Sequence, residues 1–94
     1  MKSTAEYLIL LKQFKDTKAK SYGISKIGLF GSVARGEQQE GSDVDIVYEG
    51  EAMGLFILGR LKEELEELLD ATVDLLRMRK QFDGKIIQKS ILQD

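Results

Sequence analysis

The chain of 94 residues contains no cysteine and no histidine. Without cysteine, disulfide bonds and thiolate metal sites are excluded. Without histidine, the chain lacks the most frequent general base and the commonest zinc ligand. Any catalysis must therefore depend on carboxylates, hydroxyls, lysine, arginine or tyrosine.

Aromatic residues and long apolar runs are also scarce. Four phenylalanines and three tyrosines are the only aromatic residues, so we expect a thin core that gains part of its stability from a partner surface. No apolar run approaches the roughly 18 residues of a membrane span. The N-terminus lacks the basic-then-apolar order of a signal peptide. We therefore expect a cytoplasmic protein that makes no membrane contact.

The charge balance and the length give two further expectations. The formal net charge is −2 at pH 7, whereas nonspecific nucleic-acid binders usually carry a basic excess, so direct nucleic-acid binding is disfavoured. A chain of this length supports one hydrophobic core. It shows no internal repeat, low-complexity segment or linker. We therefore expect a single domain over residues 1–94.

The spacing of apolar residues predicts helices that alternate with short strands. We expect helices at about 4–18, 32–35, 52–69 and from about 82 onward, and strands at 26–30, 43–48 and 72–76. Ser3 or Thr4 is a suitable N-cap for the first helix. This order implies an α/β fold of the α+β type, with a small three-stranded mixed sheet flanked by helices.

Two further sets of apolar residues, one near the C-terminus and one at residues 55–57, carry expectations about the core. Ile86, Ile87 and Ile91 lie at helical spacing and predict that the chain ends as a helix. The apolar residues 55–57 are expected to lie in the core rather than on a surface that binds a partner.

Two aspartates on the second predicted strand are candidate metal ligands. Asp43 and Asp45 are two positions apart and point to the same face of a strand, with Cα atoms about 6.5 to 7 Å apart. Carboxylates at that separation can converge on a pair of divalent ions. Their repulsion is unfavourable unless a cation joins them. Oxygen ligands without histidine or cysteine suit Mg²⁺ or Mn²⁺, with triphosphate oxygens completing the coordination.

A third acid and a turn complete the candidate site. Asp74 is the only other acid within a predicted strand and can reach the same pocket if that strand lies beside the second. It would then ligate a metal or accept the proton of an attacking hydroxyl. Gly31 and Ser32 lie where a strand ends and a helical turn begins, a place where free N–H groups bind phosphate. Arg35, one turn later, adds a positive charge for the same phosphates.

Each of these features alone has an ordinary structural explanation. A Gly-Ser pair after a strand is usually a plain turn, and Ser-Asp before a strand is often a cap. A calcium loop is excluded because the glycine and the closing glutamate of an EF-hand are absent. The combination and its spacing, however, rarely arise by chance.

That combination resembles the minimal nucleotidyltransferase family of the DNA polymerase beta superfamily. The family's pattern is Gly-Ser, ten residues, then Asp-x-Asp, usually with Ala-Arg-Gly after the serine and Ser-Asp before the strand. Here residues 31–36 read Gly-Ser-Val-Ala-Arg-Gly and residues 42–47 read Ser-Asp-Val-Asp-Ile-Val. No catalytic position departs from the pattern, and the likeness extends from the first helix to Asp74.

The resemblance implies a polymerase-beta-like nucleotidyltransferase fold and a set of site residues. The family's catalytic and metal-binding carboxylates fall on Asp43, Asp45 and Asp74, with two Mg²⁺ ions, or Mn²⁺, as cofactor. Its nucleotide-binding residues fall on Gly31, Ser32 and Arg35. Proteins of this kind are commonly antitoxins that are thought to move AMP from ATP to a tyrosine of a HEPN-domain toxin. The resemblance therefore implies a protein adenylyltransferase antitoxin, with ATP as substrate and a HEPN toxin as partner.

Two other functions stay open at this point. The chain could be a non-catalytic antitoxin that acts by binding alone, or a nucleotidyltransferase with a small-molecule or RNA acceptor. The sequence does not fix the base preference or the oligomeric state. It also leaves both roles of Asp74, metal ligand and base, open.

Overall fold

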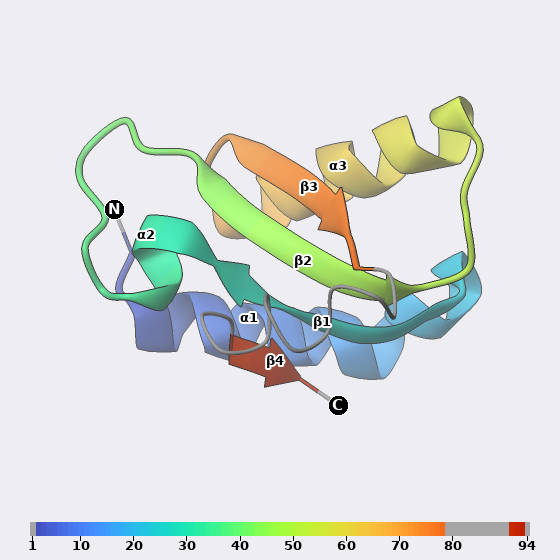
Figure 1. Ribbon diagram of the computed structural model, residues 1–94, viewed down its shortest axis with the longest axis horizontal. Helices are drawn as coiled ribbons and strands as arrows, with labels where there is room; N and C mark the ends of the chain where they lie inside the picture. The colour runs from blue at the N-terminus through green and yellow to red at the C-terminus, as the bar shows by residue number, and fades with distance from the viewer. Residues whose placement is uncertain (1, 79–90, 94) are drawn as a thin grey trace.

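The computed structural model describes residues 2–78 and 91–93, which form a sheet with two long helices behind it (Figure 1). In chain order the elements are α1 (Thr4–Thr17), the 3-10 helix η1 (Ala19–Tyr22), β1 (Ile24–Phe30), α2 (Gly31–Ala34), β2 (Val44–Gly50), α3 (Leu55–Leu69), β3 (Val73–Arg77) and β4 (Ile91–Gln93). In this part of the chain, no helix has the length and hydrophobicity that crossing a bilayer requires.

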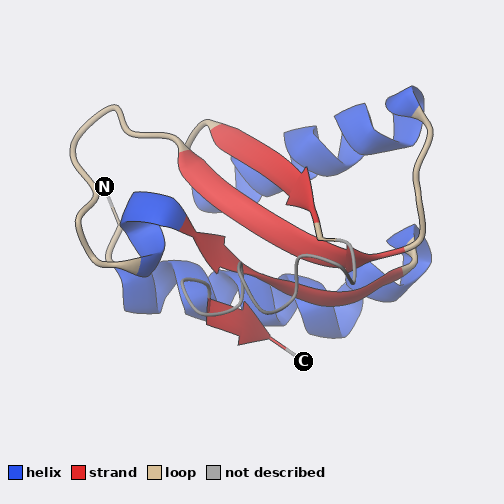
Figure 2. Ribbon diagram, viewed as in Figure 1, coloured by secondary structure: helices blue, strands red, loops and turns tan. Residues whose placement is uncertain are grey.

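The strands of the described residues form one mixed sheet in the order β3-β2-β1-β4 (Figure 2). β1 pairs antiparallel with both β2 and β4, whereas β2 and β3 are parallel. A parallel pair needs a crossover connection, and α3 supplies it. The three predicted strands are present, and β4 adds a short fourth strand at the edge beside β1.

The hydrophobic core lies between one face of the sheet and the helices α1 and α3. Alternate residues of β2 point into it, because successive side chains of a strand lie on opposite faces. The main contributors are Tyr7, Leu11 and Phe14 of α1, Val44, Ile46 and Tyr48 of β2, and Leu61, Leu65 and Leu69 of α3. The same alternation places Asp45 on the face away from the helices.

Ser3 is the N-cap of α1, in agreement with the sequence. Its hydroxyl accepts a hydrogen bond from the Glu6 N–H, and the Glu6 carboxylate accepts one from the Ser3 N–H. Such a reciprocal capping box satisfies two N–H groups at the start of the helix. These bonds also lower the pKa of Glu6. The first turn of α1 is therefore firmly placed.

The C-terminal segment differs from the helix that the sequence predicts. Ile91–Gln93 form β4, and Ile91 pairs with Leu29 of β1. The helical prediction is therefore wrong over residues 91–93, while residues 82–90 of that predicted helix lie outside the described residues. β1 offers a second edge of unpaired backbone groups, and pairing there overrides local helical periodicity.

The first turn of α3 also differs from expectation. Leu55 and Phe56 are 87% and 91% exposed, and Ile57 is 43% exposed. The expectation that they belong to the core is therefore wrong. The fully buried residues of α3 begin only at Leu61.

Substitution by alanine is expected to change the free energy of unfolding in opposite directions at Gly50 and at Gly59. A Cβ at Gly50 would collide with the backbone of Gly23 and Ile24, whereas Gly59 in α3 has open space around it. We expect Gly59→Ala to raise the free energy of unfolding by about 0.5–1 kcal/mol. Gly50→Ala should lower it by about 1–3 kcal/mol. Urea denaturation of both variants measures this, and changes of equal sign would contradict the packing at the end of β2.

Candidate active site

Asp45 and Asp74 lie side by side on neighbouring strands. The parallel register of β2 and β3 pairs Asp45 with Asp74, and neighbouring strands are about 4.8 Å apart. Paired residues of parallel strands point to the same face, so both carboxylates lie on the face opposite α1 and α3. From the sequence, Asp74 is expected to reach the pocket of Asp43 and Asp45 only if β3 lies beside β2, and in the structure these two strands are neighbours.

Asp43 adds a third carboxylate immediately before β2. It lies two residues from Asp45 and is exposed. Burial raises the pKa of Asp45, and the negative charges of Asp74 and Asp43 raise it further, while Arg35 opposes the shift. Ionised Asp45 is therefore poorly stabilised by its surroundings, a condition that a bound cation would relieve.

The predicted phosphate turn lies directly against this carboxylate pair. Phe30, the last residue of β1, pairs with Asp45. Gly31 follows with φ of 69°, a left-handed conformation that favours glycine, and a Cβ there would collide with the Asp45 carboxylate. The chain then enters α2, whose first N–H groups have no partner within the helix. Gly31 and Ser32 thus place potential phosphate donors beside the acids.

Arg35 is held by a neighbouring acid rather than by the carboxylate pair. Its Nε donates to Glu37 Oε1 at 2.6 Å, and both side chains are exposed. An exposed ion pair contributes only about 0–1 kcal/mol. The guanidinium can therefore exchange this partner for a phosphate at little cost.

Two contacts that the sequence did not reveal hold α2 in place. Thr4 Oγ1 donates to the carbonyl of Val33 at 2.6 Å, and the side-chain amide of Gln38 donates to the carbonyl of Lys2 at 3.1 Å. These bonds join residues 29 and 36 positions apart, so no local pattern shows them. The sequence indicated Thr4 only as an alternative N-cap of the first helix, and not as a donor to Val33.

A turn fixes the direction in which the chain reaches Asp43. Ser42 Oγ accepts a hydrogen bond from the Gln39 N–H at 3.1 Å, and the Ser42 N–H donates to the Gln39 carbonyl at 2.9 Å. Serine and a polar loop before the strand were the sequence signal for this turn. Ser42 is therefore a positioning residue for Asp43.

The donor atoms of the site fit a hard divalent cation. They are carboxylate oxygens only, which Mg²⁺ and Mn²⁺ prefer. Within residues 2–78 and 91–93, no three acidic side chains are grouped closely enough to enclose an ion by themselves. Mg²⁺ is usually held by one or two carboxylates together with substrate phosphates. An open pair such as Asp45 and Asp74 therefore suits a metal that arrives with a nucleotide.

A hollow of about 280 Å³ opens beside the carboxylate pair. It is lined by the two aspartates and by four apolar residues, namely Phe30, Ile46, Leu75 and Leu76. Ligand pockets usually measure about 300–1,000 Å³, so this hollow is small for a whole nucleotide and an acceptor.

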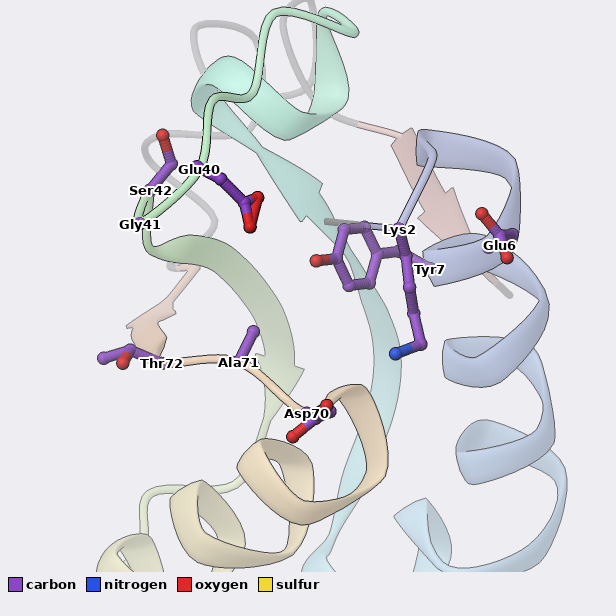
Figure 3. A pocket seen from close by; sticks show the side chains of 9 residues that line it. All are labelled: Lys2, Glu6, Tyr7, Glu40, Gly41, Ser42, Asp70, Ala71 and Thr72. Carbon is purple, nitrogen blue, oxygen red and sulfur yellow. The ribbon is translucent and has the colours of Figure 1, made fainter.

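A larger hollow of about 460 Å³ lies elsewhere, between the start of α1, residues 40–42 and residues 70–72 (Figure 3). None of the six predicted site residues lines it. Figure 3 shows the Lys2 side chain in this hollow, and its ammonium group donates to the carbonyl of Leu69 at 3.3 Å. The hollow is a junction of elements and lacks the carboxylate pair on which the predicted chemistry depends.

The fold and this arrangement of acids and turn define a nucleotidyltransferase. The chain belongs to the nucleotidyltransferase domain family, whose model matches residues 10–93. This confirms the family and the enzyme class that the motif spacing predicts.

Three curated archaeal relatives are similar over much of the chain. Protein adenylyltransferase MntA of Thermococcus cleftensis is 37% identical over 86 residues, which are 90% of this chain and 85% of that protein. A Methanocaldococcus jannaschii protein, provisionally named a protein adenylyltransferase, is 36% identical over 97 residues, covering 100% of this chain and 96% of the relative. A second protein of that organism, with the same provisional name, is 52% identical over 56 residues, 58% of this chain and 60% of its own length.

Solved structures show the same fold. A chain provisionally described as a minimal nucleotidyltransferase superposes with a TM-score of 0.75 at 29% identity, over 96% of this chain and 95% of that one. A toxin–antitoxin structure with AMP-PNP gives a TM-score of 0.69 at 22% identity, over 92% of this chain and 70% of the other. The second likeness establishes the fold alone.

Proposed function

We propose that this chain is an Mg²⁺-dependent protein adenylyltransferase that transfers AMP from ATP to a tyrosine of a HEPN-domain toxin and thereby acts as its antitoxin. The observation that carries the proposal is the pairing of Asp45 with Asp74, with Gly31 against Asp45. Three features of one small site then serve three needs of the reaction: a cation site, a phosphate site and a base.

The residues divide these tasks by position. Asp43 and Asp45 would hold two Mg²⁺ ions, or Mn²⁺, which when bound offset the charge of the triphosphate and of the departing pyrophosphate. The N–H groups at Gly31 and Ser32 donate to phosphate oxygens, and the Ser32 hydroxyl adds a further donor. Arg35 adds a positive charge at the rim.

In the proposed reaction, Asp74 would receive the proton of the acceptor. In the transfer, the acceptor oxygen bonds to the α-phosphorus of ATP while the bond to the bridging oxygen of the β-phosphate breaks, and pyrophosphate leaves. The hydroxyl proton needs a base within hydrogen-bond reach. Asp74 is exposed, lies beside Asp45 and can serve as that base, as a metal ligand, or as both.

A protein acceptor is supported by the shape of the site and by the relatives. The hollow beside the acids is small and open, so a large acceptor could supply the missing wall. The relatives that cover most of the chain carry the name protein adenylyltransferase. One similar structure is described as an AMPylated HEPN toxin in complex with its MNT antitoxin.

Label transfer tests this function. With ATP labelled in its α-phosphate, we expect Mg²⁺-dependent labelling of a HEPN-domain acceptor protein. Asp74→Asn should slow it by about 10²–10⁴-fold, because the base or ligand is lost. Asp70→Asn is the matched control, since Asp70 lies outside the site and its left-handed backbone (φ 52°) tolerates asparagine.

Three results would count against the proposal in different ways. Labelling of an RNA or a small molecule instead of the protein would identify another acceptor. Neutralisation of the toxin without any label would identify an antitoxin that acts by binding alone. Equal rates for the Asp74 and Asp70 variants would remove Asp74 from the reaction.

A further inference from the structure

The strand that carries Asp74 lies at the edge of the sheet. In the order β3-β2-β1-β4, β3 has a neighbour on one side only among the described residues (Figure 1). Two bonds fix which of its backbone groups face β2: the Val44 N–H donates to the Thr72 carbonyl at 2.8 Å, and the Met78 N–H donates to the Tyr48 carbonyl at 2.7 Å. In a parallel ladder, such bonds engage every second residue of the strand.

It follows that Asp74 and Leu76 direct their N–H and C=O groups toward β2, and that Val73, Leu75 and Arg77 direct theirs outward. The outward N–H of Val73 donates to the side chain of Glu66 at 2.9 Å. Within residues 2–78 and 91–93, the outward N–H groups of Leu75 and Arg77 have no such partner. An edge of this kind is a template for a further strand.

Leu76 makes this edge unusual, because it places an exposed apolar side chain beside the proposed base. It lies two residues after Asp74, so both point to the same face about 6.6 Å apart. It is 45% exposed, and it lines the hollow that also contains Asp45 and Asp74. An aromatic side chain that crosses Leu76 would therefore bring a terminal hydroxyl to Asp74.

We propose that an extended segment of the acceptor protein adds to the outer edge of β3 as a further strand. Its backbone bonds to the outward groups of Leu75 and Arg77, and its tyrosine packs on Leu76 with the hydroxyl at Asp74. This inference rests on the proposed function and specifies how the acceptor is held. It accounts for an aromatic hydroxyl as acceptor, because the shorter side chain of serine would not span Leu76.

Amide hydrogen exchange of the full chain, with and without the HEPN-domain acceptor protein, tests the docking edge. We expect exchange of the Leu75 and Arg77 amides to slow by at least about tenfold in the complex, as a newly bonded amide does. The Leu76 amide already faces β2 and should change much less. Protection confined to the exposed first turn of α3, at Leu55 and Phe56, would overturn the inference.

Enzyme kinetics provide the second arm. Arg77→Pro removes the outward N–H at an edge position where proline is tolerated, whereas Arg77→Ala removes the same side chain and keeps the N–H. We expect the KM for the acceptor protein to rise at least about tenfold in Arg77→Pro and Leu76→Ser, and to stay within about twofold in Arg77→Ala and Leu55→Ser. AMP-PNP affinity, measured without acceptor, shows whether the nucleotide site is intact.

The outcomes separate this inference from the function on which it rests. If the parent chain labels the acceptor and Arg77→Pro and Arg77→Ala have the same KM, edge docking is wrong and the adenylyltransferase function stands. If the parent chain neither labels nor binds that protein, both fall. If Arg77→Pro fails to fold, the hydrogen-exchange result on the parent chain decides alone.

Discussion

Asp45→Asn is expected to lower the rate of nucleotidyl transfer by at least about 10³-fold while leaving the chain folded. Asp45 is the carboxylate that the other site features surround: Asp74 pairs with it, Asp43 precedes it and Gly31 lies against it. Removal of its charge removes a ligand for the cations and with it the stabilisation of the transition state. Single-turnover label transfer with saturating Mg²⁺ and ATP measures the effect.

The same substitution should change the pH dependence of stability. The pKa of Asp45 is raised above its ordinary 3.8, so the native state binds this proton more tightly than the unfolded state does. The resulting contribution to the free energy of unfolding is complete below pH 3.8 and is lost as pH rises through the raised pKa. Without a cation, the stability of Asp45→Asn relative to the parent should therefore increase over that pH window.

Two results would contradict this account of Asp45. Transfer at a rate close to that of the parent would show that the carboxylate is not part of the reaction. A variant that loses activity and also unfolds more readily at neutral pH would show that Asp45 stabilises the fold. Asp16→Asn is the control, because Asp16 lies on the exposed side of α1, where it pairs with Lys12.

Gly31→Ala is expected to reduce transfer by about 10²-fold or more and to destabilise the chain. The left-handed conformation costs an alanine about 1–2 kcal/mol. The new Cβ must also displace the Asp45 carboxylate, and a shift of about 1 Å in a reacting group can cost 10²-fold in rate. Transfer kinetics and urea denaturation together separate the two effects.

Gly41→Ala is the matched control for this prediction. Gly41 has a similar φ of 83° but open space where a Cβ would lie. It should lose about 1–2 kcal/mol of stability and keep nearly all of its activity. Equal rates for the two variants would contradict the close contact between the turn and Asp45.

The sequence predicted the acidic part of the site because its cause is local. A spacing of two residues keeps Asp43 close to Asp45 at the start of β2, and this depends on few residues. The position of Asp74 depended on one tertiary condition, the pairing of β3 with β2, which the family likeness supplied. The three helices and three strands from α1 to β3, apart from the 3-10 helix η1, were predicted with boundary differences of up to three residues, whereas β4 was not.

What the sequence could not show depends on contacts between distant segments. The bond from Thr4 to Val33 and the pairing of Ile91 with Leu29 leave no local pattern. The exposure of Phe56 depends on how α3 packs in the tertiary structure, and hydrophobicity alone does not predict it. The ion pair of Arg35 with Glu37 is local in sequence. Whether Arg35 pairs with Glu37 or with Asp45, however, depends on the course of the loop after α2.

The central claim is that Asp45 and its neighbouring acids bind a cation together with a triphosphate. Isothermal titration of AMP-PNP with and without Mg²⁺ measures it directly, in the parent chain and in Asp45→Asn. We expect Mg²⁺ to raise the affinity of the parent for AMP-PNP at least about tenfold and to have little effect on the variant. The same gain in both chains, or none in the parent, would contradict the claim.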